Sequence, residues 1–203
     1  MKHITPIEQY DDIIENEVIS HIEPNTYYKS CTIVDEDTYT YDQVKFERCT
    51  FTLPTFEKIE MLDTIFLYCD LSNCNFEETL LHRVDFIHCK LVGSLFIEAN
   101  LGYVRFKDSI LRYANFASTK IKHVLFESCE LVEASFLHTK HKELQFDHCM
   151  IQKLDLRETK LAGIDISTCE FESLFLDLQH SKGLKIRFDQ AASIAIMLGL
   201  EIA

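Results

Sequence analysis

Large apolar residues recur at every fifth position along most of this 203-residue chain. Stepping by five from Phe46 to Leu176 gives 27 positions, and only His141 among them is not a large apolar residue. Thirteen of the 15 phenylalanines lie on this ladder, so one spacing accounts for nearly all of them. Repetition on this scale decides the architecture before any helix or strand is assigned.

A five-residue period matches neither regular element of secondary structure. An α-helix would spread these positions around its surface, and a single strand would send alternate positions to opposite faces. The pattern instead fits a chain that turns a corner every five residues and closes a four-sided coil in 20. Residues 20 apart would then stack at about 4.8 Å, the spacing of hydrogen-bonded strands.

Seven cysteines form a column in this coil, and from Cys49 onward their spacing is 20 residues, or 40 where Ser109 takes the place. A column of thiols with parallel Cα–Cβ bonds is poorly placed for disulfides and cannot converge on one metal ion. We interpret them as small buried packing residues, and expect no metal and no cofactor. The column comprises Cys31, Cys49, Cys69, Cys89, Cys129, Cys149 and Cys169.

Two segments show the repeat unit most clearly: Asn73-Cys74-Asn75-Phe76 and Tyr113-Ala114-Asn115-Phe116. A small residue, then Asn or Asp, then Leu or Phe is the motif of the pentapeptide-repeat family, which this chain resembles. The resemblance covers residues 26–178. It implies an all-β fold, a right-handed quadrilateral β-helix (pentapeptide-repeat solenoid), with a short C-terminal α-helix outside it.

The rest of the composition narrows the class of protein. The nine histidines are scattered, and the sequence contains no Ser-His-Asp pattern, HExxH motif or glycine-rich phosphate loop. We therefore expect no catalytic residues and no enzyme activity. No apolar run reaches the roughly 18 residues that a membrane span needs, and the first residues have no signal-peptide core, so we expect a cytoplasmic protein.

Residues 1–25 lie outside the repeat and form an acidic extension in this interpretation. Thr5-Pro6-Ile7-Glu8 reads as a capping box with proline at the first helical position, which predicts a short helix over 6–17. Residues 34–43 interrupt the register, and the acidic run Asp35-Glu36-Asp37 predicts a small protruding loop there.

The chain changes character again over residues 179–203. Asp189 is placed to cap a helix over Gln190–Leu198, and Gly199 to end it. A nine-residue helix that is apolar nearly all round must pack on something. It either caps the last coil only, or also docks against a second copy. The candidate dimerisation residues are Ala191, Ile194, Ala195, Met197, Leu198, Leu200 and Ile202.

The same tail extends the resemblance. Gln190-Ala191-Ala192-Ser193, followed by Leu198-Gly199-Leu200, is similar to the C-terminal segment of the quinolone-resistance (Qnr-type) and albicidin-resistance pentapeptide proteins. That resemblance implies a homodimer formed through the C-terminal helix. It also implies binding to DNA gyrase or topoisomerase IV as a mimic of duplex DNA, with protection of the enzyme from fluoroquinolones.

The formal net charge of −13 is unevenly distributed, since residues 1–43 carry 10 acidic and 2 basic side chains. One acidic face is the candidate surface for a cationic DNA-binding groove, although carboxylates of this kind also serve simply to keep a rod solvated. Its members are Glu57, Glu77, Glu78, Glu98, Asp155, Glu158 and Asp177.

The next face carries a lysine stripe: Lys120, Lys122, Lys140, Lys142 and Lys160. Because the protein is acidic overall and has no aromatic residues interleaved with these lysines, we expect no direct contact with nucleic acid. His141, the one polar position of the ladder, is predicted to turn outward on a local bulge.

A second hypothesis keeps the same fold and changes the partner. A solenoid presents flat, extended faces, and Leu67 and Ile87 are apolar surface candidates one coil apart. The alternative function is therefore a pentapeptide-repeat scaffold or regulator that binds a different protein.

Overall fold

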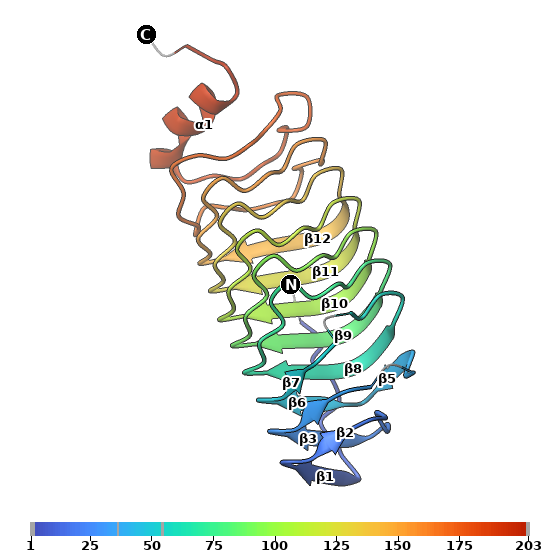
Figure 1. The fold of residues 1–203 in the computed structure, drawn as a ribbon. Helices are drawn as coiled ribbons and strands as arrows, with labels where there is room; N and C mark the ends of the chain where they lie inside the picture. The colour runs from blue at the N-terminus through green and yellow to red at the C-terminus, as the bar shows by residue number, and fades with distance from the viewer. Residues whose placement is uncertain (1–2, 36, 54, 202–203) are drawn as a thin grey trace.

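The computed structural model describes residues 3–35, 37–53 and 55–201, which form a parallel β-solenoid with a short helix at its C-terminal end (Figure 1). One sheet runs the length of the coil in the order β1-β3-β6-β8-β9-β10-β11-β12, with β5 also paired to β8, and a smaller sheet has the order β2-β4-β7. The N-terminal strands are β1 (Asp12–Glu15), β2 (Val18–Ile19), β3 (Thr26–Lys29), β4 (Thr32–Ile33), β5 (Thr40–Asp42), β6 (Lys45–Glu47) and β7 (Thr50–Phe51). The long strands are β8 (Glu60–Leu67), β9 (Leu80–Ile87), β10 (Asn100–Lys107), β11 (Lys120–Glu127) and β12 (Lys140–Asp147).

The register of the long strands confirms the predicted coil length. Phe66 pairs with Phe86, which in turn pairs with Phe106, so every fourth rung of the ladder meets its equivalent on the next coil. The first coils are shorter, since Asp12 pairs with Thr26 and Tyr28 with Phe46. Beyond β12 the coil continues through single bridges as far as Asp165 and Lys185, past the predicted boundary at residue 178.

The corners of the coil explain the five-residue period. A residue with positive φ stands at every fifth position from Lys58 to Gly163, and nearly all of these residues are not glycine. L-residues adopt this conformation at a cost, so the corners depend on hydrogen bonds to neighbouring coils. At one such corner the Asn73 N–H donates to the Val92 carbonyl oxygen at 2.8 Å. Between corners, the large apolar residue points inward and is buried.

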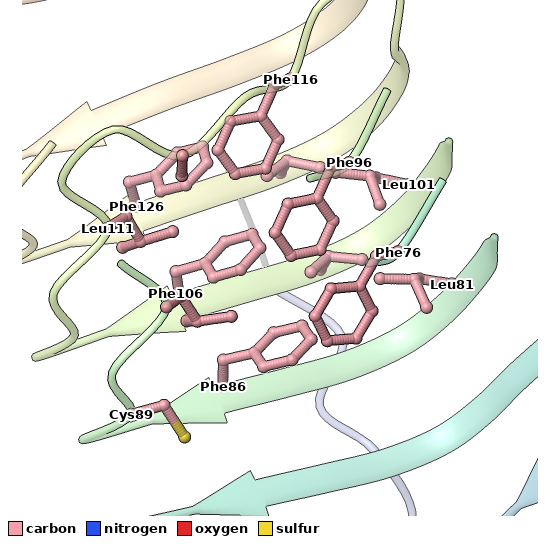
Figure 2. Packing of buried hydrophobic residues seen from close by; sticks show 14 of the residues in the cluster. Phe76, Leu81, Phe86, Cys89, Phe96, Leu101, Phe106, Leu111, Phe116 and Phe126 are labelled. Carbon is pink, nitrogen blue, oxygen red and sulfur yellow. The ribbon is translucent and has the colours of Figure 1, made fainter. Parts of the chain in front are cut away.

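Two stacks of phenylalanines fill the interior (Figure 2). Phe86, Phe106 and Phe126 lie in one stack, with ring centroids 4.8 and 4.7 Å apart and planes within 4° of parallel. Phe96 and Phe116 belong to the other stack, and Phe116 meets Phe106 edge-on at 83°. The strand spacing sets the stacking distance, and the edge-on contacts between the stacks are a favoured aromatic geometry.

The predicted helix over residues 6–17 is wrong. Residues 3–10 are extended, and β1 and β2 add a further coil before the predicted start of the solenoid at residue 26. The register also resumes earlier than expected, because Tyr41 pairs with Met61 and is 3% exposed. Of the predicted loop, Glu36 lies outside the described residues, and the Asp35 carboxylate accepts hydrogen bonds from the backbone of Ile22, Asp37 and Thr38.

The segment before β1 runs back along the long sheet (Figure 1), and its contacts reach from β8 to β9. His3 Nε2 lies 2.9 Å from Asp85, and the Ile7 N–H donates to Asp63 at 3.1 Å. Both carboxylates are only 2% exposed and are paired with arginines, Asp63 with Arg83 and Asp85 with Arg105. The side chains of Ile4 and Ile7 point to solvent, whereas Pro6 is buried and the Tyr10 ring packs against Tyr27, so both polar and apolar contacts hold this segment.

The C-terminal helix confirms the main prediction for that end and corrects one detail. Residues Phe188–Gln190 form a 3₁₀ turn (η1) that leads into α1 (Ala191–Met197), and Gly199, with φ of 81°, follows its end. Asp189 does not cap the helix; it forms an ion pair with Arg187. Gln190 ties the turn to the solenoid, because its amide accepts from the Arg187 N–H and donates to the carbonyls of Ile166 and Cys169.

Truncation of a central stacked ring should reveal how much the stacks stabilise the coil. We expect Phe106→Ala to lower the free energy of unfolding by about 3–5 kcal/mol, because it opens a cavity between rings that cannot collapse onto each other. Phe175→Ala, at a ring that is 48% exposed, is the matched control and should cost far less. Equal losses in urea denaturation would contradict the assigned core.

Candidate interaction surfaces

The cysteine column lies inside the coil as packing, in agreement with its interpretation. All eight cysteines are free and buried, and the thiols of Cys89 and Cys129 donate to the carbonyls of Phe66 and Phe106, each at 3.3 Å. Burial raises the pKa of Cys49, Cys74 and Cys89 to about 12, so the reactive thiolate is suppressed near neutral pH. Among the described residues, no group of three or more His, Cys, Asp or Glu side chains is arranged to hold a metal.

Ser109 occupies one position of the cysteine column, with a hydroxyl group in place of the thiol. Its hydroxyl donates to the carbonyl of Lys107 at 2.8 Å and accepts from the Cys89 N–H at 3.0 Å. The position therefore requires a small side chain that can hydrogen-bond to the backbone, and sulfur chemistry is not needed there.

The acidic face is less anionic than its sequence suggests. Lys58 lies 2.8 Å from Glu57 and 3.6 Å from Glu78, so two carboxylates share one ammonium group and the three side chains together carry one negative charge. Further along, three members of the face have cationic or titratable neighbours: Asp155 with Arg157, Glu158 with His138, and Asp177 with His180. Within the described chain, Glu77 and Glu98 are the two members of the face that form no such pair.

The strongest concentration of negative charge lies at the N-terminal end of the rod. Residues 1–43 carry a net charge of −8, and Asp11, Asp12, Glu17 and Glu23 are exposed on the first coils. Exposed charges of one sign raise the local potential and accelerate the approach of a cationic partner. The predicted acidic face and these coils therefore form two separate acidic regions.

The lysine stripe forms a basic region beside the acidic face, on the coils that contain residues 120–160. All five lysines are exposed, and Lys120 and Lys140 line a hollow together with Glu98, a member of the acidic face. The structure thus brings acidic and basic columns next to each other, as the order of the faces in the sequence predicted.

His141 stays on the ladder, so the predicted outward bulge is wrong. It pairs with Ile121 in unbroken register, is half-buried, and lies 2.6 Å from the Lys160 carbonyl through Nε2. The hydrogen bond satisfies one ring nitrogen, while Nδ1 is buried without a partner among the described residues. An imidazole can occupy the rung because the carbonyl of the next coil accepts a hydrogen bond from its ring N–H.

Exposed apolar side chains gather at the C-terminal end. Of the 15 exposed large hydrophobic residues described, five lie between residues 175 and 200. Of the predicted dimerisation residues, Ile194 is buried against the solenoid and Met197 and Leu198 are half-buried, whereas Leu200 is 52% exposed. Ala191 is exposed, Ala195 is half-buried, and Ile202 lies outside the described residues. Ile196 and Phe188, which were not among the predicted contacts, are 63% and 96% exposed.

Comparison with known proteins agrees with this geometry. A family profile described as "Pentapeptide repeat region" matches residues 79–156. A trypsin-treated form of QnrB1, a plasmid-mediated fluoroquinolone resistance protein, superposes with a TM-score of 0.55 at 16% identity, covering 94% of this chain and 98% of that one. A second trypsin-treated form gives 0.49 at 18% identity, covering 94% and 97%.

A pentapeptide repeat protein from the thylakoid lumen of Arabidopsis thaliana gives a TM-score of 0.38 at 23% identity, over 49% of this chain and 66% of that one. No curated protein sequence matches the chain. No helix in the described part of the chain is both long and apolar enough to cross a membrane.

The five-residue corners, the stacked rungs and the profile match define the class of protein: a parallel β-solenoid built from pentapeptide repeats. Residues 79–156 match the pentapeptide-repeat profile, and the fold of the chain resembles that of QnrB1.

Proposed function

We propose that this chain is a non-enzymatic, DNA-mimicking protein that binds DNA gyrase or topoisomerase IV in the cytoplasm and shields the enzyme from fluoroquinolones. The observation that carries the proposal is the match of fold to QnrB1 over nearly the whole of both chains. At 16% identity this match concerns the fold, so the partner has to be argued from the surface and tested.

The surface supports a cationic partner of elongated shape. Duplex DNA carries about one negative charge per 1.7 Å of axis, and the enzyme groove that holds it must be correspondingly basic. The N-terminal coils, with a net charge of −8, and the unpaired Glu77 and Glu98 supply negative charge along a stiff rod. Long-range attraction of this kind accelerates encounter more than it increases the final affinity.

The C-terminal end supports a homodimer. The helix is too short to be stable alone, and its contact with the solenoid covers Ile194 but leaves Phe188, Ile196 and Leu200 in solvent. A two-fold axis would place this self-complementary apolar surface against its copy. In the proposed assembly two rods meet through their C-terminal ends, and the acidic coils lie at the far ends.

Charge reversal on the exposed side chains tests the dimer without removing the cap. We expect the wild-type protein to have the mass of a dimer by light scattering at micromolar concentration. Phe188→Glu/Ile196→Glu should give a monomer with an unchanged circular dichroism spectrum, because both residues point to solvent in the single chain. Tyr113→Glu, at an exposed residue of a middle coil, is the control. A monomeric wild-type protein would overturn the proposed interface.

Binding to the topoisomerase is tested with purified gyrase and topoisomerase IV. We expect the protein to bind at micromolar concentration, duplex DNA to compete, and gyrase supercoiling to continue at fluoroquinolone concentrations that otherwise stop it. Glu77→Lys/Glu98→Lys should slow association about tenfold at low salt, because it reverses the two unpaired charges of the acidic face.

The matched control is Glu133→Lys/Glu172→Lys, which makes the same change of net charge on other faces and should have a smaller effect. Absence of binding to both enzymes would reject the proposed function. Binding without protection would restrict it to occupancy of the enzyme, and a different protein partner in a pull-down would favour the scaffold alternative.

A further inference from the structure

The lysine stripe lacks the ion pairs that most other described lysines form. Lys29, Lys45, Lys58, Lys90, Lys107 and Lys153 each have a carboxylate within 4 Å. None of the five stripe lysines has such a partner among the described residues, and all five side chains are exposed. A basic region without counter-charges is unexpected on a protein of net charge −13.

The strand register places these like charges directly beside each other. Lys120 pairs with Lys140 and Lys122 with Lys142 across the β11–β12 ladder. Like charges at directly opposed positions destabilise a sheet, so this arrangement works against folding. Elsewhere on the rod, neighbouring coils place opposite charges together, as in Lys107 with Glu127 and Lys153 with Glu133.

The surface at the stripe is hollowed in three adjoining places, and Lys140 lines all of them. The largest hollow, of about 770 Å³, is bordered by Lys140, Lys160, His138 and His180 and has His141 in its wall. A second, of about 220 Å³, is bordered by Lys120 and Lys122, and includes Gly102, where a side chain would meet His82. The hollows follow the stripe across successive coils and form one basic groove.

Few carboxylates oppose the lysines in this groove. Glu98 and Glu158 are the acidic residues of its lining, and Glu158 lies 3.6 Å from His138. Glu143, beside Lys142, is hydrogen-bonded to His123. Four lysines therefore face two carboxylates in the lining, before any contribution from the histidines.

We propose that this basic groove binds a linear inorganic polyphosphate chain, with Lys120, Lys140 and Lys160 as the phosphate contacts. Lysine is well suited to this ligand, because its compact ammonium group binds phosphate as a point charge without demanding one geometry. The inference rests on the lysines and does not depend on the acidic N-terminal coils, and the groove borders the acidic face at Glu98 and Glu158.

The spacing of the charges favours closely spaced phosphates over an acidic peptide. Stripe lysines on neighbouring coils stand about 4.8 Å apart along the rod. An extended peptide presents same-face carboxylates roughly 6.6–6.8 Å apart. Successive carboxylates would therefore not align with lysines on successive coils. Single-stranded nucleic acid is disfavoured for a different reason: sequence-tolerant binding relies on aromatic stacking, and no Phe, Tyr or Trp lines these hollows.

The test is titration of the full-length protein with fluorescently labelled linear polyphosphate, followed by anisotropy at several salt concentrations. We expect saturable binding that weakens steeply with salt, because bound counter-ions are exchanged for lysines. Lys120→Gln/Lys140→Gln/Lys160→Gln should weaken binding at least about tenfold and flatten the salt dependence. These side chains are exposed, so circular dichroism should match that of the wild-type protein, and removal of the opposed Lys120 and Lys140 charges should keep or raise the unfolding midpoint.

The matched control is Lys90→Gln/Lys107→Gln/Lys153→Gln, which removes the same charge from lysines that have carboxylate partners. Its binding should be unchanged. Equal loss in both triple variants, or no binding of polyphosphate at low salt, would overturn the proposal. Equal or tighter binding of poly-glutamate or of single-stranded oligonucleotide would also overturn it, since either result assigns the groove to another ligand.

Discussion

The stacking of each coil on the next in a fixed register is the constraint on which the rest of the molecule depends. It places Phe86 over Phe66 and under Phe106, and it lets the corner backbone bond to the following coil. Because every coil touches mainly its neighbours, the stability of the rod is a sum of contacts between adjacent coils. Each terminal coil has one uncovered face, which other residues must cap. At the C-terminal end, the Gln190 side chain holds the capping helix in place by donating hydrogen bonds to the carbonyls of Ile166 and Cys169.

The same register determines what the surface can offer. Side chains at equivalent positions of successive coils form columns, so a single repeated residue type becomes a stripe of charge or of apolar surface. The solenoid places Lys120 beside Lys140, and it places Lys58 within ion-pair distance of Glu78 on the next coil. Both proposals therefore rest on columns of surface side chains and on the ends of the rod. The interior thiols contribute packing, and burial raises their pKa values.

Periodicity allowed most of the solenoid to be predicted, because each rung is specified by its own residue and is repeated many times. The first coil could not be predicted in this way, since Asp12 already pairs with Thr26, short of a full repeat, and the segment has no ladder of its own. The local pattern at Thr5 to Glu8 favours a helix, but contacts with Asp63 and Asp85, which lie several coils further along the chain, hold this segment extended. Pairing across coils likewise keeps His141 on its rung, and Lys58 and Arg157 offset two of the seven negative charges of the acidic face.

Coil insertion tests the central role of the register most directly. Duplicating residues 101–120 after Lys120 adds one complete coil, whereas inserting a single alanine at the same point shifts every later rung. The first variant should keep or raise the midpoint of urea unfolding and lengthen the rod by about 4.8 Å in solution scattering. The second should lower the midpoint sharply. Similar losses in both variants would contradict an architecture that depends on a fixed register between coils.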